Sequence, residues 1–84
     1  MTPKKFPPDK PQPQLMRLAQ AADSAGVSRQ TIEYYIMIGL VQPIRRGKGR
    51  YFDDKLIGRI RLIRSLNDSG YTLRSIRETY LSRR

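Results

Sequence analysis

The fold of this chain is restricted most strongly by three residues at fixed spacing, Ala22, Gly26 and Ile32. A small side chain late in one helix lets a second helix cross it closely, and a glycine four positions later allows the positive φ that a tight turn requires. A branched apolar residue six positions further on fills the angle between the two helices. The spacing predicts a helix-turn-helix, with a plain helical hairpin as the alternative.

Apolar periodicity predicts the first helix, from about residue 15 to Ser24. Its apolar residues recur at i, i+3, i+4 and i+7, which is the spacing of one helix face. The residues expected on this buried face are Leu15, Leu18, Ala19 and Ala22. Gly26 follows the helix and can adopt the left-handed conformation that ends it.

The second helix is predicted over residues 29–38, with Ser28 as its N-cap and Gly39 at its end. At about 100° per residue, one side of this helix is mostly apolar and is expected to be core. The predicted core side comprises Ser28, Ile32, Tyr35 and Ile36. The opposite side comprises Arg29, Gln30, Glu33, Tyr34 and Met37, with Thr31 and Ile38 at its edge.

Farther along the chain, short β-capable segments flank two glycines and predict a basic hairpin between Ile44 and Phe52. Asp53 is the expected N-cap of a third helix, and Thr72 is that of a fourth. The apolar stripes expected on these two helices are Leu56, Ile60, Ile63 and Leu66, then Leu73, Ile76 and Tyr80. The chain is therefore predicted to be mainly α, with four helices and a small β-hairpin.

The composition indicates what kind of partner the domain binds. The 84 residues include 17 Lys and Arg against 7 Asp and Glu, which is a net charge of +10, and they include no Cys and no His. Without Cys, disulfides and thiolate chemistry are excluded, and without His most transition-metal sites and general-base mechanisms are excluded as well. We therefore expect one small domain that binds a polyanion, with no enzymatic activity, cofactor or metal.

The N-terminal segment differs in composition from the rest of the chain. Five of the six prolines lie within residues 1–14, among lysines and glutamines. We predict a disordered arm over residues 1–14 and a single domain over residues 15–84. Because the apolar stretches are only three or four residues long, we expect no membrane span, no secretion signal and a cytoplasmic, nucleoid-associated protein.

The exposed side of the second predicted helix carries side chains suited to reading DNA. Arg bonds bidentately to guanine and Gln to adenine, while Thr and Tyr hydroxyls suit phosphates. Glu33 would repel a polyanion unless it accepts a bond from a cytosine amino group or pairs with Arg29 at i+4. Tyr35 is expected in the core, and for Tyr34 phosphate contact and simple exposure both stay open.

The predicted hairpin concentrates positive charge. Its cations are Arg45, Arg46, Lys48 and Arg50, next to Tyr51. Cations at a turn form either a solvated tip or a wing that lies along a phosphate backbone. Beside a helix-turn-helix the wing is favoured, because counterion release rewards clustered phosphate contacts.

These motifs, in this order, resemble the DNA-binding domain of the mercury-resistance-regulator (MerR) family. The resemblance begins with AADSAGVSRQTIEYY at 21–35 and continues with GLVQP at 39–43 and GRY at 49–51. It extends through Leu56, residues 60–63, GYTL at 70–73 and IRE at 76–78, and it covers about residues 16–82. The ordered set is far more specific than any one of its motifs.

The resemblance implies a winged helix-turn-helix that binds double-stranded DNA, with the second helix in the major groove and the wing on the flanking backbone. Family members typically bind as dimers to inverted-repeat promoters and twist an overlong spacer, so that RNA polymerase can engage both promoter elements. By resemblance, Tyr34, Arg50 and Tyr51 are DNA contacts, and Arg17 matches a position at the start of the first helix. The full set of candidate DNA-binding residues is Arg17, Ser28, Arg29, Gln30, Thr31, Tyr34, Arg45, Arg46, Lys48, Arg50 and Tyr51.

The chain departs from the family pattern at three places. Glu33 stands where the family usually has Arg, which reverses the charge of one expected contact. Ile36, Met37 and Ile38 replace charged residues, and Met37 and Ile38 form a candidate protein contact. The family normally continues into a long helix and an effector domain, whereas this sequence stops at Arg84. We expect either a fragment of a longer, homodimeric regulator or a stand-alone domain.

Three functions stay open at this point. The leading one is sequence-specific binding of double-stranded DNA as part of a MerR-like transcriptional regulator. The second is an excisionase-like or architectural DNA factor, because such proteins are also small winged helices without an effector domain. The third is a protein-interaction module that retains the fold, with apolar interface candidates Met37, Ile38, Ile57 and Leu62.

Overall fold

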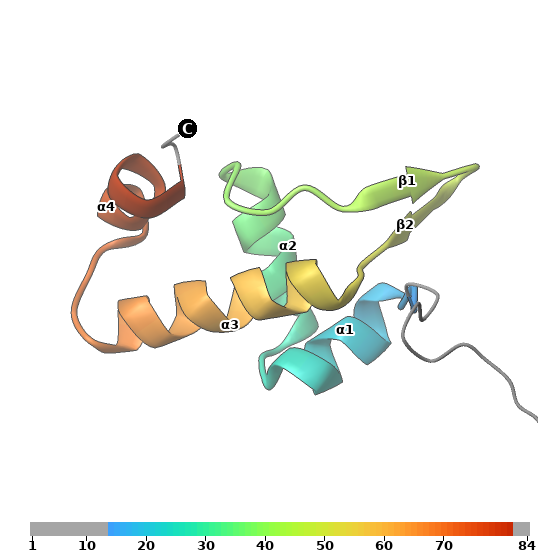
Figure 1. The fold of residues 1–84 in the computed structure, drawn as a ribbon, viewed down its shortest axis with the longest axis horizontal. Helices are drawn as coiled ribbons and strands as arrows, with labels where there is room; N and C mark the ends of the chain where they lie inside the picture. The colour runs from blue at the N-terminus through green and yellow to red at the C-terminus, as the bar shows by residue number, and fades with distance from the viewer. Residues whose placement is uncertain (1–13, 82–84) are drawn as a thin grey trace, which may run out of the picture.

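The computed structural model describes residues 14–81, in which a pair of crossed helices is followed by a hairpin and two further helical segments (Figure 1). The elements are α1 (Leu18–Ala25), α2 (Arg29–Met37), β1 (Ile44–Arg46), β2 (Gly49–Tyr51), α3 (Asp54–Asp68) and α4 (Leu73–Ile76), followed by a π-helical turn (Arg77–Leu81). The predicted fold class, four helices with a small β-hairpin, is confirmed. All but the last residue of the predicted arm, 1–14, lies outside the described residues.

The local signals for turns and helix starts are confirmed. Ser28, Asp53 and Thr72 each accept a hydrogen bond from the backbone N–H three residues later, at 3.0 Å in all three cases. Each side chain thereby satisfies an amide that has no partner inside its helix. Gly26 ends α1 with a φ of 73°, and its N–H donates to the carbonyl of Ala22 at 2.9 Å. These residues set the boundaries of the helix-turn-helix and of the helices after it.

The predicted start of α1 is wrong, and its predicted buried face is right for Ala22 and for the partly buried Leu18 only. Met16 exchanges two backbone hydrogen bonds of 2.8 Å with Phe52, so the chain is extended there and the helix begins only at Leu18. Leu15 therefore does not belong to the helix, and Ala19 is exposed. The buried residues of α1 are Ala21, Ala22 and Ala25.

A single apolar core contains residues of α1, α2, α3 and α4. Among these elements α3 is the long central helix (Figure 1). Among the described residues, every buried side chain is hydrophobic. The largest fully buried side chains are Phe52, Ile32, Leu40, Ile60, Ile63, Ile76 and Val41. The prediction that Ile60 and Ile63 lie in the core is confirmed, whereas Leu56 and Leu66 are only partly buried.

Two assignments to core and surface are corrected. Ser28, which was expected on the core side of α2, is exposed because its hydroxyl is needed at the helix end as the cap. Ile57, which was expected to be free for an interface, has only 6% of its surface exposed. It packs beside Ile60 in the core, since the buried face of α3 is rotated toward it.

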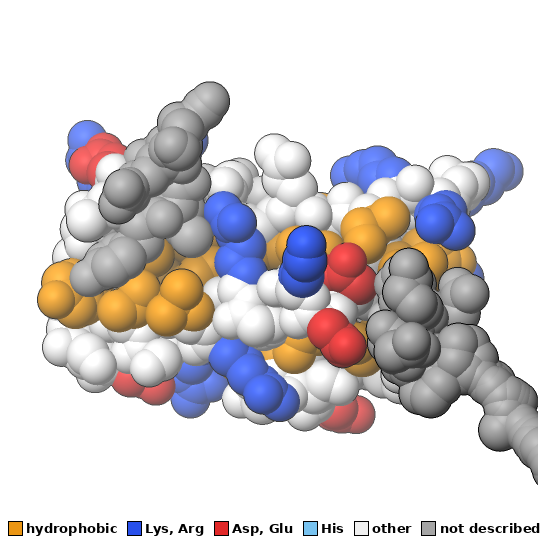
Figure 2. All heavy atoms as spheres, in the orientation of Figure 1, with side chains coloured by type: hydrophobic (Ala, Val, Ile, Leu, Met, Phe, Trp, Pro, Cys, Tyr) orange, Lys and Arg blue, Asp and Glu red, His pale blue; other side chains and the backbone are white. Residues whose placement is uncertain are grey.

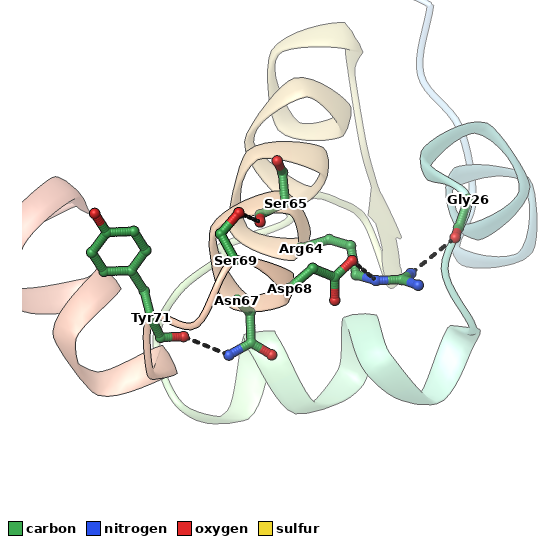
Figure 3. A network of polar contacts seen from close by, with 7 residues as sticks. All are labelled: Gly26, Arg64, Ser65, Asn67, Asp68, Ser69 and Tyr71. Carbon is green, nitrogen blue, oxygen red and sulfur yellow. Dashed lines mark hydrogen bonds and ion pairs between the residues drawn. The ribbon is translucent and has the colours of Figure 1, made fainter.

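Arginines of α3 hold the turn between α1 and α2 and the segment after α2 in place, which the sequence did not predict. Three guanidinium groups donate to backbone carbonyls from distant parts of the chain. The pairs are Arg59 to Leu40 at 2.9 Å, Arg61 to Ser24 at 2.6 Å and Arg64 to Gly26 at 3.2 Å. Arg64 also pairs with Asp68 at 3.1 Å (Figure 3). A turn that would otherwise end in free carbonyls is therefore anchored to the central helix.

No helix in the described part of the chain has the length and apolar character needed to span a bilayer.

Candidate nucleic-acid interface

The exposed side of α2 is a continuous polar face. Its residues Arg29, Gln30, Glu33 and Tyr34 are all exposed, and Thr31 lies at the edge, half-buried. On the opposite side, Ile32 and Tyr35 have 0% and 3% of their surfaces exposed. The prediction that these two residues lie on the core side of the helix is confirmed. The core thus fixes the helix and leaves the side chains that were predicted to read bases in solvent.

The hairpin presents two different faces. In its register Arg45 lies opposite Arg50, and Ile44 lies opposite Tyr51. Because directly opposite residues share a face, one face carries the two arginines and the other carries the tyrosine ring. Gly49 leaves room for that ring, since a Cβ there would lie 2.8 Å from the nearest ring carbon of Tyr51.

The tyrosine face of the hairpin is connected to the start of α1. Arg17, the residue just before α1, donates from its Nη2 to the Tyr51 hydroxyl at 3.1 Å. The guanidinium carbon also lies 5.1 Å from the centre of the Tyr51 ring, within the range of a cation–π contact. Two predicted site residues that are 34 positions apart in sequence therefore form one contact.

The arginine face of the hairpin is connected to α2 through Glu33. Arg50 donates two hydrogen bonds to this carboxylate, at 3.0 and 2.8 Å. The bond from Arg50 lowers the pKa of Glu33 below its ordinary value, and the same bond raises the pKa of Arg50. The expected partner of Glu33 was Arg29 or a cytosine, and the structure instead places it against the wing.

The three remaining wing cations, Arg45, Arg46 and Lys48, are exposed. None of them pairs with an acidic side chain among residues 14–81. Figure 2 shows basic side chains over the wing at the upper right and across the middle of the same face, with acidic ones between them. Three charges of the wing are therefore free to meet a phosphate, and the fourth is already paired.

The two apolar residues at the end of α2 differ in exposure. Met37 has 71% of its surface exposed, whereas Ile38 is half-buried and packs against the core. Tyr34 is also exposed, at 47%. Of the candidate protein contact, Met37 alone projects fully into solvent.

The sequence profile of the MerR HTH regulatory protein family matches residues 16–82. This chain belongs to the MerR family. It is similar to the mercuric resistance operon regulatory protein of Bacillus cereus, 36% identical over 62 residues, and to heavy metal-dependent transcription regulator 2 of Rhizobium meliloti (strain 1021), 32% identical over 65 residues. These matches cover 71% and 75% of this chain but 47% and 44% of the relatives, so the chain spans about half their length.

Two solved structures of MerR-type regulators share the fold. The transcription regulator PbrR691 from Ralstonia metallidurans CH34, in complex with lead(II), has a TM-score of 0.70 and 28% identity, covering 75% of this chain and 50% of its own. HiNmlR, a MerR family regulator lacking the sensor domain and bound to promoter DNA, has a TM-score of 0.71 and 28% identity, covering 77% and 51%. The winged helix-turn-helix is confirmed, and the chain corresponds to the DNA-binding domain of a MerR-family transcriptional regulator.

Local spacing could not reveal the contacts between the wing and the helices. Glu33 and Arg50 are 17 residues apart, and nothing in the sequence between them indicates that they meet. One indirect signal was available. A short hairpin turn places Arg45 opposite Arg50. Two like charges directly opposite each other destabilise a hairpin, and an acidic side chain nearby offsets this repulsion.

Proposed function

We propose that this domain binds double-stranded DNA in a sequence-specific manner, with α2 in the major groove and the wing on the flanking phosphates. The observation that carries this proposal is the exposed polar face of α2 beside three unpaired wing cations. A recognition helix needs solvent-exposed side chains on a buried scaffold, and a wing needs cations without internal partners. The promoter DNA in the HiNmlR structure supports the same assignment.

Ten of the eleven candidate residues have a role in this arrangement, and the eleventh, Arg50, is paired with Glu33. Arg29 and Gln30 read base edges from the first turn of α2, where a recognition helix comes closest to the bases. The hydroxyls of Ser28, Thr31 and Tyr34, together with the Arg17–Tyr51 pair, position the domain on phosphates. The free wing cations Arg45, Arg46 and Lys48 supply affinity that does not depend on sequence.

In the whole protein we propose a regulator of transcription that acts through binding alone, without catalysis, in the cytoplasm on the nucleoid. Its relatives are named as regulators, and the matches cover 47% and 44% of their lengths. A homodimer of a longer chain would place two recognition helices on an inverted repeat, and RNA polymerase is the partner that such a site would affect.

A salt titration of binding to random-sequence duplex tests this proposal. Because each phosphate contact contributes about −0.9 to the slope of log K against log salt, three free wing cations give a slope of about −2.7. Selection from the same pool then reports the site. An enriched inverted repeat supports a dimeric regulator, and single or direct half-sites support an architectural factor.

Two substitutions separate the roles of the helix and the wing. We expect Arg46→Ala to weaken binding to all duplexes similarly and to reduce the slope by about 0.9, whereas Gln30→Ala changes the preferred sequence. Arg74→Ala is the matched control. Arg74 lies on α4, pairs with Glu78 at 3.4 Å and is not a candidate DNA contact. Equal losses on selected and scrambled DNA for both variants would contradict the assignment of α2 as the recognition helix.

The exposure of Met37 favours one other function, a protein-interaction module. An apolar side chain that is 71% exposed beside a basic face suits an acidic protein partner. In that case duplex binding would be weak and without a preferred sequence, and Met37→Ser would reduce partner binding without changing the fold.

A further inference from the structure

The ion pair between Glu33 and Arg50 lies in the middle of the surface proposed to meet DNA. Both residues are partly exposed, with 47% and 31% of their side-chain surfaces accessible. The pair is bidentate, at 3.0 and 2.8 Å, so both terminal nitrogens of the guanidinium are directed at the carboxylate. One of the four wing cations is thus occupied by an acid of the recognition helix.

At physiological pH both members of this pair are ionised, and their opposite charges cancel. The hydrogen bond from Arg50 holds the pKa of Glu33 below its ordinary value, so the carboxylate stays ionised. Arg45 faces Arg50 across the hairpin, so Glu33 also neutralises one of two adjacent like charges. The wing therefore gives Glu33 a stable position that it would lose if Arg50 turned toward a phosphate.

We propose that Glu33 is a specificity-determining residue, which holds Arg50 away from the phosphates of non-cognate DNA and releases it on sites that offer the carboxylate a hydrogen-bond donor. The cytosine amino group is the donor that a major groove presents to a carboxylate. This inference rests on the proposed function, because it requires α2 to lie in the groove.

The discrimination follows from what happens to Glu33 on each kind of site. On non-cognate DNA, moving Arg50 to a phosphate would leave the Glu33 carboxylate unpaired and facing a polyanion. The ion pair therefore stays formed, and Arg50 displaces no counterion from the DNA. On a site with a suitably placed cytosine, the base replaces Arg50 as the donor, and the freed guanidinium gains a phosphate. Glu33 thus raises the ratio of specific to non-specific affinity by penalising the wrong sites.

Glu33→Gln tests this directly in the salt titration on random duplex. The uncharged amide offers Arg50 one neutral acceptor oxygen in place of a bidentate carboxylate and holds it far more weakly, so we expect a slope steeper by about 0.9 and affinity higher on the order of five- to tenfold at about 0.1 M salt. The matched control is Glu78→Gln, which removes the same charge from an exposed ion pair with Arg74. An identical response of both variants would overturn the proposal, because a general change of charge would then explain it.

The Arg50→Ala background shows whether Glu33 acts through Arg50. In that background we expect Glu33→Gln to leave the slope unchanged, since no guanidinium remains to be released. A steeper slope there would overturn the proposal, because Glu33 would then act only through its own repulsion of DNA. Circular dichroism spectra and melting temperatures of all variants check that they are folded.

Site selection gives the second readout. We expect the site selected by the wild-type protein to contain a cytosine that Glu33→Gln no longer prefers, and the ratio of specific to random affinity to fall in the variant. An unchanged site and an unchanged ratio would overturn the proposal. Absence of salt-dependent duplex binding by the wild-type protein would instead contradict the proposed function itself, so the two failures are distinguishable.

Discussion

Glycine is needed for the backbone conformation at Gly26, whereas at Gly58 it only weakens a helix. Gly26 has a φ of 73°, which L side chains rarely adopt, while Gly58 lies inside the α-helix α3. A Cβ at either position would meet nothing within 4 Å. A side chain would cause no steric clash at either position. Its effect on the free energy of unfolding therefore depends only on the backbone conformation.

We predict that Gly26→Ala and Gly58→Ala change stability in opposite directions. Gly26→Ala should lower the free energy of unfolding by roughly 1–2 kcal/mol, the cost of the left-handed conformation for a residue with a Cβ. Gly58→Ala should raise it by roughly 0.5–1 kcal/mol, because alanine loses less entropy than glycine in a helix. Urea denaturation followed by circular dichroism measures both. Changes of the same sign would contradict the geometry of the turn.

The titration of Glu33 is a second prediction for a single residue. Its pKa in the folded protein lies below the ordinary value of 4.5, because it accepts a hydrogen bond from Arg50. The pair therefore stabilises the fold fully above that ordinary value, and this contribution is lost as pH falls through the lower, folded pKa. NMR titration of the carboxyl carbon measures the shift. In Arg50→Ala the pKa should return toward its ordinary value, and an unchanged low value would require another cause.

At the scale of elements, the wing is held by one contact on each of its faces. Tyr51 meets Arg17 at the start of α1, and Arg50 meets Glu33 on α2. A two-stranded hairpin is marginal in water by itself, so these contacts and the Met16–Phe52 bridge at its base determine where the wing points. The position of the wing relative to the recognition helix is therefore a property of three elements together.

We predict that Gly49→Ala displaces the Tyr51 ring and loosens the wing while the domain stays folded. The new Cβ would lie 2.8 Å from a ring carbon and 2.9 Å from the hydroxyl oxygen, which a real contact does not allow. The ring can move because it is the end of a side chain, and it then loses Arg17. NMR measures the effect as changed shifts of the Arg17 side chain and greater mobility of the hairpin. Lys48→Ala, at the exposed turn, should leave Arg17 unchanged, and a Gly49→Ala spectrum equal to it would contradict the prediction.

For the whole molecule, stability depends on one small core. Domains shorter than about 70–80 residues rarely gain more than about 3–5 kcal/mol from a single core. Here α3 contributes Ile57, Ile60 and Ile63 to that core, while Leu62 on the same helix is 47% exposed. A loss at one central position is therefore comparable to the entire stability of the domain.

We predict that Ile60→Ala leaves the domain largely unfolded at 25 °C, whereas Leu62→Ala changes the free energy of unfolding by less than about 0.5 kcal/mol. Truncating a fully buried isoleucine costs roughly 2–5 kcal/mol, because the cavity adds to the lost burial. Thermal melts and urea titrations monitored at 222 nm, in the absence of DNA, compare the two variants. Similar midpoints would show that the core does not centre on Ile60.

Much of the fold was predictable because its signals are local. Ser28, Asp53 and Thr72 cap the helices that follow them, and Gly26 takes the left-handed turn, since each acts on residues at most four positions away. The division of α2 into Ile32 and Tyr35 inside and a polar face outside follows from helical periodicity in the same way. Periodicity misplaced the buried face of α1 because Met16 pairs with a residue from the far side of the hairpin.

The sequence by itself determined the elements, their order, the basic face and the family. The tertiary structure alone decided that Arg50 meets Glu33, that Arg17 meets Tyr51 and that Arg64 holds the carbonyl of Gly26. These partners are 17, 34 and 38 residues apart in the sequence. A long, flexible arginine pairs with whatever the packed core brings within reach, so its partner is known only once the helices are in place.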